Sequence, residues 1–119
     1  MSSWERYNIA GQQALSAGKP LDAEQQFKLA IKEAESMGPR EPKIAQSMSA
    51  LANAYRQQGK YAEAEPMYKQ AIEKMTSIKG PTCSELVPIF DNYAKMLRAA
   101  GRGPEADKMD AKARAIFAK

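Results

Sequence analysis

One spacing of small residues recurs three times along the 119-residue chain. In each copy a small residue is followed seven positions later by a glycine and, after five more, by an alanine. The three copies are Gly11-Gly18-Ala23, Ala52-Gly59-Ala64 and Ala94-Gly101-Ala106, so the alanines lie 41 and 42 residues apart. A fixed period of roughly 20–50 residues is typical of a repeat array, in which neighbouring units bury one another's apolar faces. The spacing therefore predicts a solenoid.

Each copy has the pattern of two amphipathic helices joined by a tight turn. Apolar or small residues at positions 48, 51, 52 and 55 follow the i, i+3, i+4, i+7 spacing of one helix face. Gly59 then suits the left-handed position that commonly follows a helix end, and Gly-Pro pairs at 38–39 and 80–81 separate the copies. We expect six antiparallel helices in one domain over residues 1–119, with repeats at about 4–37, 42–78 and 84–118. Pro88 predicts a late or distorted start for the fifth helix.

Aromatic residues complete the first two copies. Phe27 and Tyr68 follow the repeated alanines by four positions, and we expect each ring to fill the space beside a small residue on the other helix of its hairpin. The third copy has Asp110 at this position, between Lys108 and Lys112. A charged residue there predicts a polar end to the array, and we expect the third hairpin to complete it.

Composition narrows the functional classes. Lys and Arg exceed Asp and Glu by four, but the charges interleave along the chain, whereas nucleic-acid-binding domains usually gather their cations on one face. The chain has no histidine and one cysteine, Cys83, so we expect no zinc site, no cofactor and no His-based catalysis. No apolar run approaches the roughly 18 residues of a membrane span, and the first residues lack the pattern of a secretory leader. We therefore expect a cytoplasmic protein with no nucleic-acid or membrane partner.

These residues resemble a known family. The stretch at 51–72, LANAYRQQGKYAEAEPMYKQAI, is similar to the tetratricopeptide (TPR) repeat, in particular to the longer-period subgroup typified by kinesin light chain. The usual repeat has 34 residues, and the third copy departs from the pattern with Gly103-Pro104 after its turn. The resemblance covers essentially the whole chain and implies an all-α, right-handed superhelix of three helical hairpins. It also implies that Phe27 and Tyr68 pack against the next hairpin.

In this family the first helix of each hairpin lines a concave groove that binds a partner polypeptide. Carried over by position, the resemblance implies nine groove residues: Asn8, Gln12, Gln46, Ser49, Asn53, Arg56, Asp91, Lys95 and Arg98. Side-chain amides offer both donors and acceptors, which suits the backbone of an extended peptide. The alternative is that these are ordinary exposed polar residues. The cation clamp with which some members hold a C-terminal carboxylate is not reproduced, because Pro88 and Asn92 occupy places where cations are expected.

The resemblance implies a non-catalytic module that binds a protein or peptide partner whose identity the sequence does not reveal. The rival interpretation is a structural or self-associating subunit of a larger assembly, which binds through its ends by way of Trp4 or the last helix. We expect Trp4 to cover the end of the first helix, and the alternative is an exposed anchor for a partner. We expect a monomer or a weak homo-oligomer.

Overall fold

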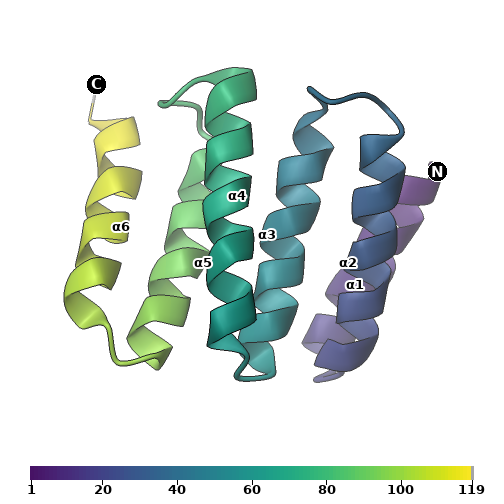
Figure 1. Cartoon of the computed structure of the whole chain (residues 1–119), viewed down its shortest axis with the longest axis horizontal. Helices are drawn as coiled ribbons and strands as arrows, with labels where there is room; N and C mark the ends of the chain where they lie inside the picture. The colour runs from purple at the N-terminus through teal and green to yellow at the C-terminus, as the bar shows by residue number, and fades with distance from the viewer. Residues whose placement is uncertain (119) are drawn as a thin grey trace.

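The computed structural model describes residues 1–118, which form six α-helices in three antiparallel hairpins (Figure 1). The helices are α1 (Ser3–Ser16), α2 (Pro20–Glu35), α3 (Pro42–Gln57), α4 (Tyr61–Lys79), α5 (Leu86–Ala99) and α6 (Gly103–Phe117). This arrangement confirms the predicted all-α fold of helical hairpins. Lys119, the last residue of the predicted domain, lies outside the described residues. In Figure 1, α1, α3 and α5 form a row behind α2, α4 and α6.

The turn inside each hairpin depends on glycine. Gly18, Gly59 and Gly101 have φ values of 72°, 75° and 77°, which disfavour residues with a side chain. In the second hairpin, the Lys60 N–H donates to the Tyr55 carbonyl at 2.9 Å and the Gly59 N–H donates to the Arg56 carbonyl at 3.0 Å. This pair of bonds is the Schellman motif, which satisfies the last carbonyls of a helix. The same pair of bonds follows α1 and α5, so three equivalent turns set three equivalent hairpins.

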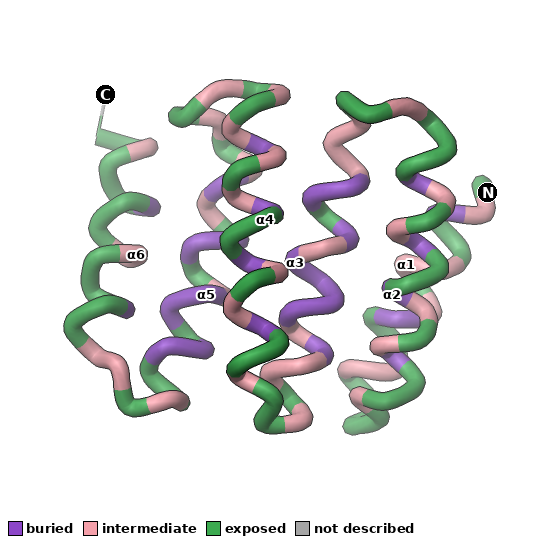
Figure 2. Tube along the Cα trace, in the orientation of Figure 1, coloured by how far each residue is buried: buried purple, intermediate pink, exposed green. Residues whose placement is uncertain are grey.

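The core lies between the two rows of helices, and most of its buried residues belong to α3 and α5 (Figure 2). Phe27 of α2 is fully buried and packs in a cluster with Leu51 and Ala54 of α3. Tyr68 of α4 is also fully buried and stacks on Tyr93 of α5, with ring centroids 5.5 Å apart. Both rings therefore pack against the next hairpin, as predicted.

The third hairpin has an ion pair where the others have an aromatic ring. Asp110 of α6 accepts a hydrogen bond from Arg98 of α5, and Arg98 also donates to Asp107 at 3.1 Å. Only Ala106 and Ala113 of α6 are buried. The exposed residues of this helix are mostly charged, although Phe117 near its end is also exposed.

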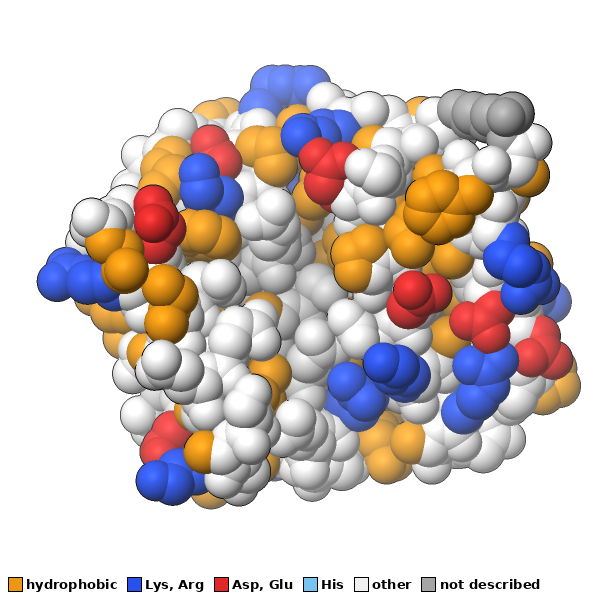
Figure 3. All heavy atoms as spheres, turned by 180° about the vertical axis from the view of Figure 1, so that it is seen from behind, with side chains coloured by type: hydrophobic (Ala, Val, Ile, Leu, Met, Phe, Trp, Pro, Cys, Tyr) orange, Lys and Arg blue, Asp and Glu red, His pale blue; other side chains and the backbone are white. Residues whose placement is uncertain are grey.

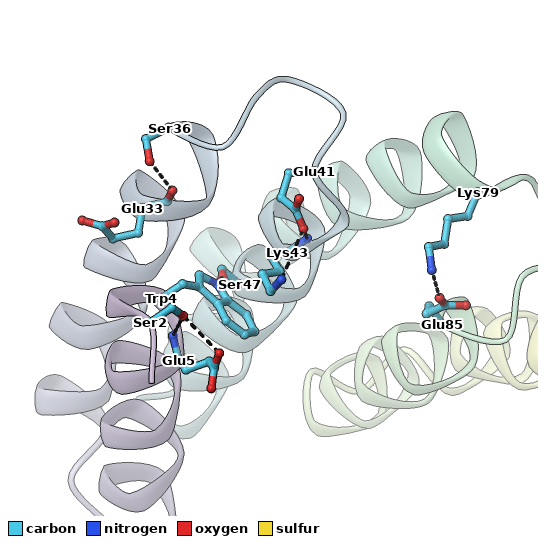
Figure 4. Close-up of polar contacts among 10 residues, drawn as sticks. All are labelled: Ser2, Trp4, Glu5, Glu33, Ser36, Glu41, Lys43, Ser47, Lys79 and Glu85. Carbon is cyan, nitrogen blue, oxygen red and sulfur yellow. Dashed lines mark hydrogen bonds and ion pairs between the residues drawn. The ribbon is translucent and has the colours of Figure 1, made fainter.

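Trp4 fills a place in the core. Its side chain is 8% exposed and clusters with Ala34 and Ile44, and its Nε1–H donates to Ser47 Oγ of α3 at 2.7 Å (Figure 4). The Lys43 ammonium lies over the indole, 5.4 Å from the ring centroid. Trp4 is therefore buried rather than an exposed anchor, as the favoured interpretation expected, and it ties the first hairpin to the second.

Proline affects two helices differently. α5 begins at Leu86 and places Pro88 in its first turn, where the missing N–H removes no helical bond; Ser84 and Glu85 form a turn instead, so the start is late as predicted. Pro66 lies in the interior of α4, on its exposed side, and the helix continues past it to Lys79. The ring removes one N–H donor from the bonding of α4 at that place.

Candidate functional site

The row of α1, α3 and α5 presents a hollow near its centre. Figure 3 shows this face as uncharged and recessed in the middle, with charged side chains around the margins. The hollow has a volume of about 220 Å³. Its lining residues are Gln12, Gln46, Ser49, Ala50, Asn53, Glu85, Pro88, Ile89 and Asn92. Four side-chain amides, one hydroxyl and one carboxylate thus surround a small apolar surface.

The hollow brings together only part of the predicted set. Gln12 of α1 and Gln46, Ser49 and Asn53 of α3 line it. The other five predicted residues are not among its lining: Asn8, Arg56, Asp91, Lys95 and Arg98. Arg98 instead donates to carboxylates of α6, and Asp91 and Lys95 are exposed on α5.

α5 contributes a stripe that the carry-over by position did not select. Residues 85, 88, 89 and 92 have the i, i+3, i+4, i+7 spacing of one helix face. The hollow lies between α3 and α5, so it is lined by the side of α3 that faces α5 and by the side of α5 that faces α3. Gln46 and Ala50 line the hollow together with their equivalents Pro88 and Asn92, 42 residues later, whereas Ser49 and Asn53 line it without their equivalents Asp91 and Lys95. The regular spacing of 85, 88, 89 and 92 was the available signal.

Asn53 has a structural bond as well as a place in the hollow. Its Oδ1 accepts a short hydrogen bond from the hydroxyl of Tyr68, and Arg56 Nε donates to the same hydroxyl at 3.3 Å. Burial raises the pKa of Tyr68 to about 12, so the phenol stays protonated at neutral pH and keeps donating to Asn53. The Asn53 amide is therefore held in place by α4, and its substitution would disturb the core too.

Two carboxylates, one on α2 and one on α4, tie their hairpins to the next hairpin along the chain. Glu65 of α4 accepts two hydrogen bonds from the Arg102 guanidinium at 2.8 and 2.9 Å, and one from the Tyr93 hydroxyl at 2.6 Å. The bonds from Arg102 are the main cause that lowers the pKa of Glu65 to about 2. Glu24 of α2 accepts a similar bond from Gln58 at 2.9 Å. These bonds help to fix α3 and α5 relative to their neighbours, and so help to set the shape of the hollow.

The chemistry of the lining is that of hydrogen bonding. The one carboxylate of the lining belongs to Glu85. It forms an ion pair with Lys79, and the hydrogen bond from Lys79 lowers the pKa of Glu85 (Figure 4). Among residues 1–118, no three His, Cys, Asp or Glu side chains lie close enough together to hold a metal ion. Within that same range, no helix combines the length and the apolar character needed to cross a membrane. The hollow is thus equipped to hold a ligand by amide hydrogen bonds and apolar contact.

A model of the tetratricopeptide-repeat family matches residues 6–77. The chain belongs to this family. Its fold is similar to that of the crystal structure of the TPR domain of FLU from Arabidopsis, with a TM-score of 0.82. That similarity covers 97% of this chain and 94% of the other at 20% sequence identity, so it concerns the fold alone. No curated protein matches the sequence. TPR domains are in general non-catalytic modules of protein–protein interaction.

Proposed function

We propose that this TPR domain binds an extended segment of a partner polypeptide in the hollow of α1, α3 and α5. The observation that carries the proposal is the convergence of side-chain amides from three helices on one small apolar surface. Each amide has donors and an acceptor, so several of them can pair with a peptide backbone whatever its side chains. No Lys or Arg lines the hollow, which favours uncharged peptide groups over a terminal carboxylate.

The size of the hollow limits what it can hold. Its volume of about 220 Å³ is below the roughly 300–1,000 Å³ of a typical small-molecule site. One side chain of a peptide fits against Ala50 and Ile89, while the rest of the segment crosses the surface. A small interface of this kind favours a transient complex, near micromolar, or about −8 kcal/mol.

Gln46 and Asn92 are the best residues for a test, because they line the hollow and make no side-chain hydrogen bond within residues 1–118. Replacing both with alanine should weaken peptide binding by about 1–3 kcal/mol, or roughly 5- to 150-fold, because each lost bond contributes about 0.5–1.5 kcal/mol. The matched control replaces Gln25 and Gln70, two exposed amides of the outer helices. It should bind as the wild type does.

The measurement begins with selection of binders from a random peptide library by the wild-type chain. Calorimetry of a selected peptide with both double variants then gives the affinities, and thermal melts show that the variants fold. Equal affinity of the Gln46/Asn92 variant and the wild type for every selected peptide would exclude the hollow as the binding site.

Two further features of the proposal rest on the sequence. The spacing of 41 and 42 residues supports the longer-period subgroup of the family and one domain of three repeats. The lone cysteine suits a reducing compartment, which favours the cytoplasm.

Light scattering at several protein concentrations tests the rival role of a self-associating subunit. In that role the measured mass must rise with concentration.

A further inference from the structure

A second hollow lies on the opposite face, between the outer helices α4 and α6. It has a volume of about 540 Å³, with Ile72 on the α4 wall, Met109 on the α6 wall, and Phe90 and Tyr93 of α5 at its base. A hollow of about 350 Å³ adjoins it and shares Ile72 and Phe90, so the two form one trough. Most of the residues that line the trough belong to α4, α5 and α6, and in Figure 1 α5 lies behind α4 and α6.

The trough exists because α4 and α6 both pack on α5 and, within residues 1–118, make no direct backbone contact with each other. Ile72, Met109 and Ile116 pack against the core but stay partly exposed along the trough. Its character therefore differs from that of the first hollow, where amides predominate. An apolar lining favours an occupant with apolar side chains.

We propose that this trough docks an amphipathic helix of a partner protein, with an apolar stripe flanked by acidic residues. The trough runs along α4 from Lys69 to Ser77 and along α6 from Met109 to Ile116. These runs advance eight and seven residues, or about 10–12 Å of helix axis, which is about two turns. Two turns of a docked helix present apolar side chains at i, i+3 or i+4, and i+7, the usual contacts of a helix in a groove.

The charges at the edge of the trough indicate an acidic occupant. Lys112 of α6 has no ion-pair partner within residues 1–118. Lys69 of α4 has Glu65 at 3.9 Å, a carboxylate that is already bound by Arg102. Glu73 is the one acidic residue of the lining, so cations are in excess. A second copy of this chain, with a net charge of +4, would bring like charges together, whereas an acidic helix would bring complementary ones.

A synthetic probe tests the proposal without knowledge of the natural partner. The probe is an acetylated and amidated peptide of about 14 residues, long enough for the two turns in contact, with a leucine stripe flanked by glutamates and alanine elsewhere. Its twin has lysine in place of each glutamate. Titrated into the ¹⁵N-labelled full chain, the acidic peptide should shift the amide signals of α4 and α6 around the trough, and the basic twin should bind at least about tenfold more weakly.

A charge reversal at the trough supplies the matched comparison. Lys112→Glu should weaken binding of the acidic peptide by about tenfold, because it replaces attraction with repulsion at the contact. Lys32→Glu makes the same change on α2, outside the trough, and should have little effect. Melts of both variants confirm folding. The Gln46/Asn92 double variant should bind this probe normally, which separates the present proposal from the peptide-binding function of the first hollow.

Several results would overturn the proposal. The first is no binding of the acidic peptide up to about 1 mM, which corresponds to about −4 kcal/mol. The second is equal weakening of binding by Lys112→Glu and Lys32→Glu. The third is a set of amide shifts confined to α1, α3 and α5. A dimer in light scattering that Lys112→Glu dissociates or strengthens would assign the trough to a second copy instead.

Discussion

Replacement of Gly11 by alanine is expected to lower the free energy of unfolding by about 1–2 kcal/mol, although alanine normally favours a helix interior by about 1 kcal/mol. A Cβ atom at Gly11 would lie 2.6 Å from Cζ and 2.7 Å from Cδ1 of Phe27. Phe27 is fully buried against the second hairpin, so its ring has little room to move away. Overpacking typically costs about 1–3 kcal/mol. Because three ring atoms of Phe27 would lie closer than 3.0 Å to the added atom, we expect the upper part of that range, which leaves a net loss of about 1–2 kcal/mol.

Urea unfolding measures this effect, and Gly103→Ala is the matched control. Gly103 begins α6, and a Cβ atom there would meet nothing within 4 Å, so this variant should be as stable as the wild type or slightly more so. Combining Gly11→Ala with Phe27→Leu should cost less than the sum of the two single changes, because the smaller side chain makes room for the added methyl group. A Gly11→Ala variant as stable as the wild type would show that the shift of the ring costs no more than the gain in helix propensity, about 1 kcal/mol.

The fold was largely predictable because its determinants are local and periodic. The left-handed glycines, such as Gly59, and the small residues seven positions before them repeat at intervals that the sequence displays directly. Phe27 and Tyr68 could be assigned to the next hairpin because the resemblance to the family implies that contact at their position in the repeat. Trp4 occurs once and belongs to no repeat, so periodicity did not reveal its bond to Ser47.

The candidate site was less predictable because it depends on the relation between hairpins. Position-by-position transfer identified Gln46 and Asn53 on α3 but not Asn92 on α5, whose equivalent on α3 is the apolar Ala50. The bond between Tyr68 and Asn53 depends on the alignment of α4 against α3. The trough depends on the distance between α4 and α6, and no periodic pattern in the sequence indicates that distance.

The carboxylate of Glu65 should make the stability of the chain depend on pH in the acid range. Its pKa in the folded chain is about 2, against an ordinary value of 4.5, chiefly because Arg102 donates two hydrogen bonds to it. A group whose pKa is lowered by folding contributes stability above its unfolded value and loses that contribution as the pH falls. Stability from Glu65 should therefore be complete above about pH 5 and disappear towards pH 2. The side chain is 19% exposed, so solvent screening reduces the contribution to about 1–2 kcal/mol.

The variant Glu65→Gln isolates this contribution, because other carboxylates with lowered pKa values, such as Glu24 and Glu105, remain in both proteins. It should be about 1–2 kcal/mol less stable than the wild type at pH 7, and the difference should shrink as the pH falls to about 2. Glu63→Gln removes an exposed charge from the same helix and should change stability by no more than about 0.5 kcal/mol. Urea unfolding of the three proteins from pH 7 to pH 2 gives the comparison. If the stability deficit of Glu65→Gln stays constant over this range, its effect comes from the shape of the side chain. If the deficit disappears in acid, the charge of Glu65 stabilises the contact between the second and third hairpins.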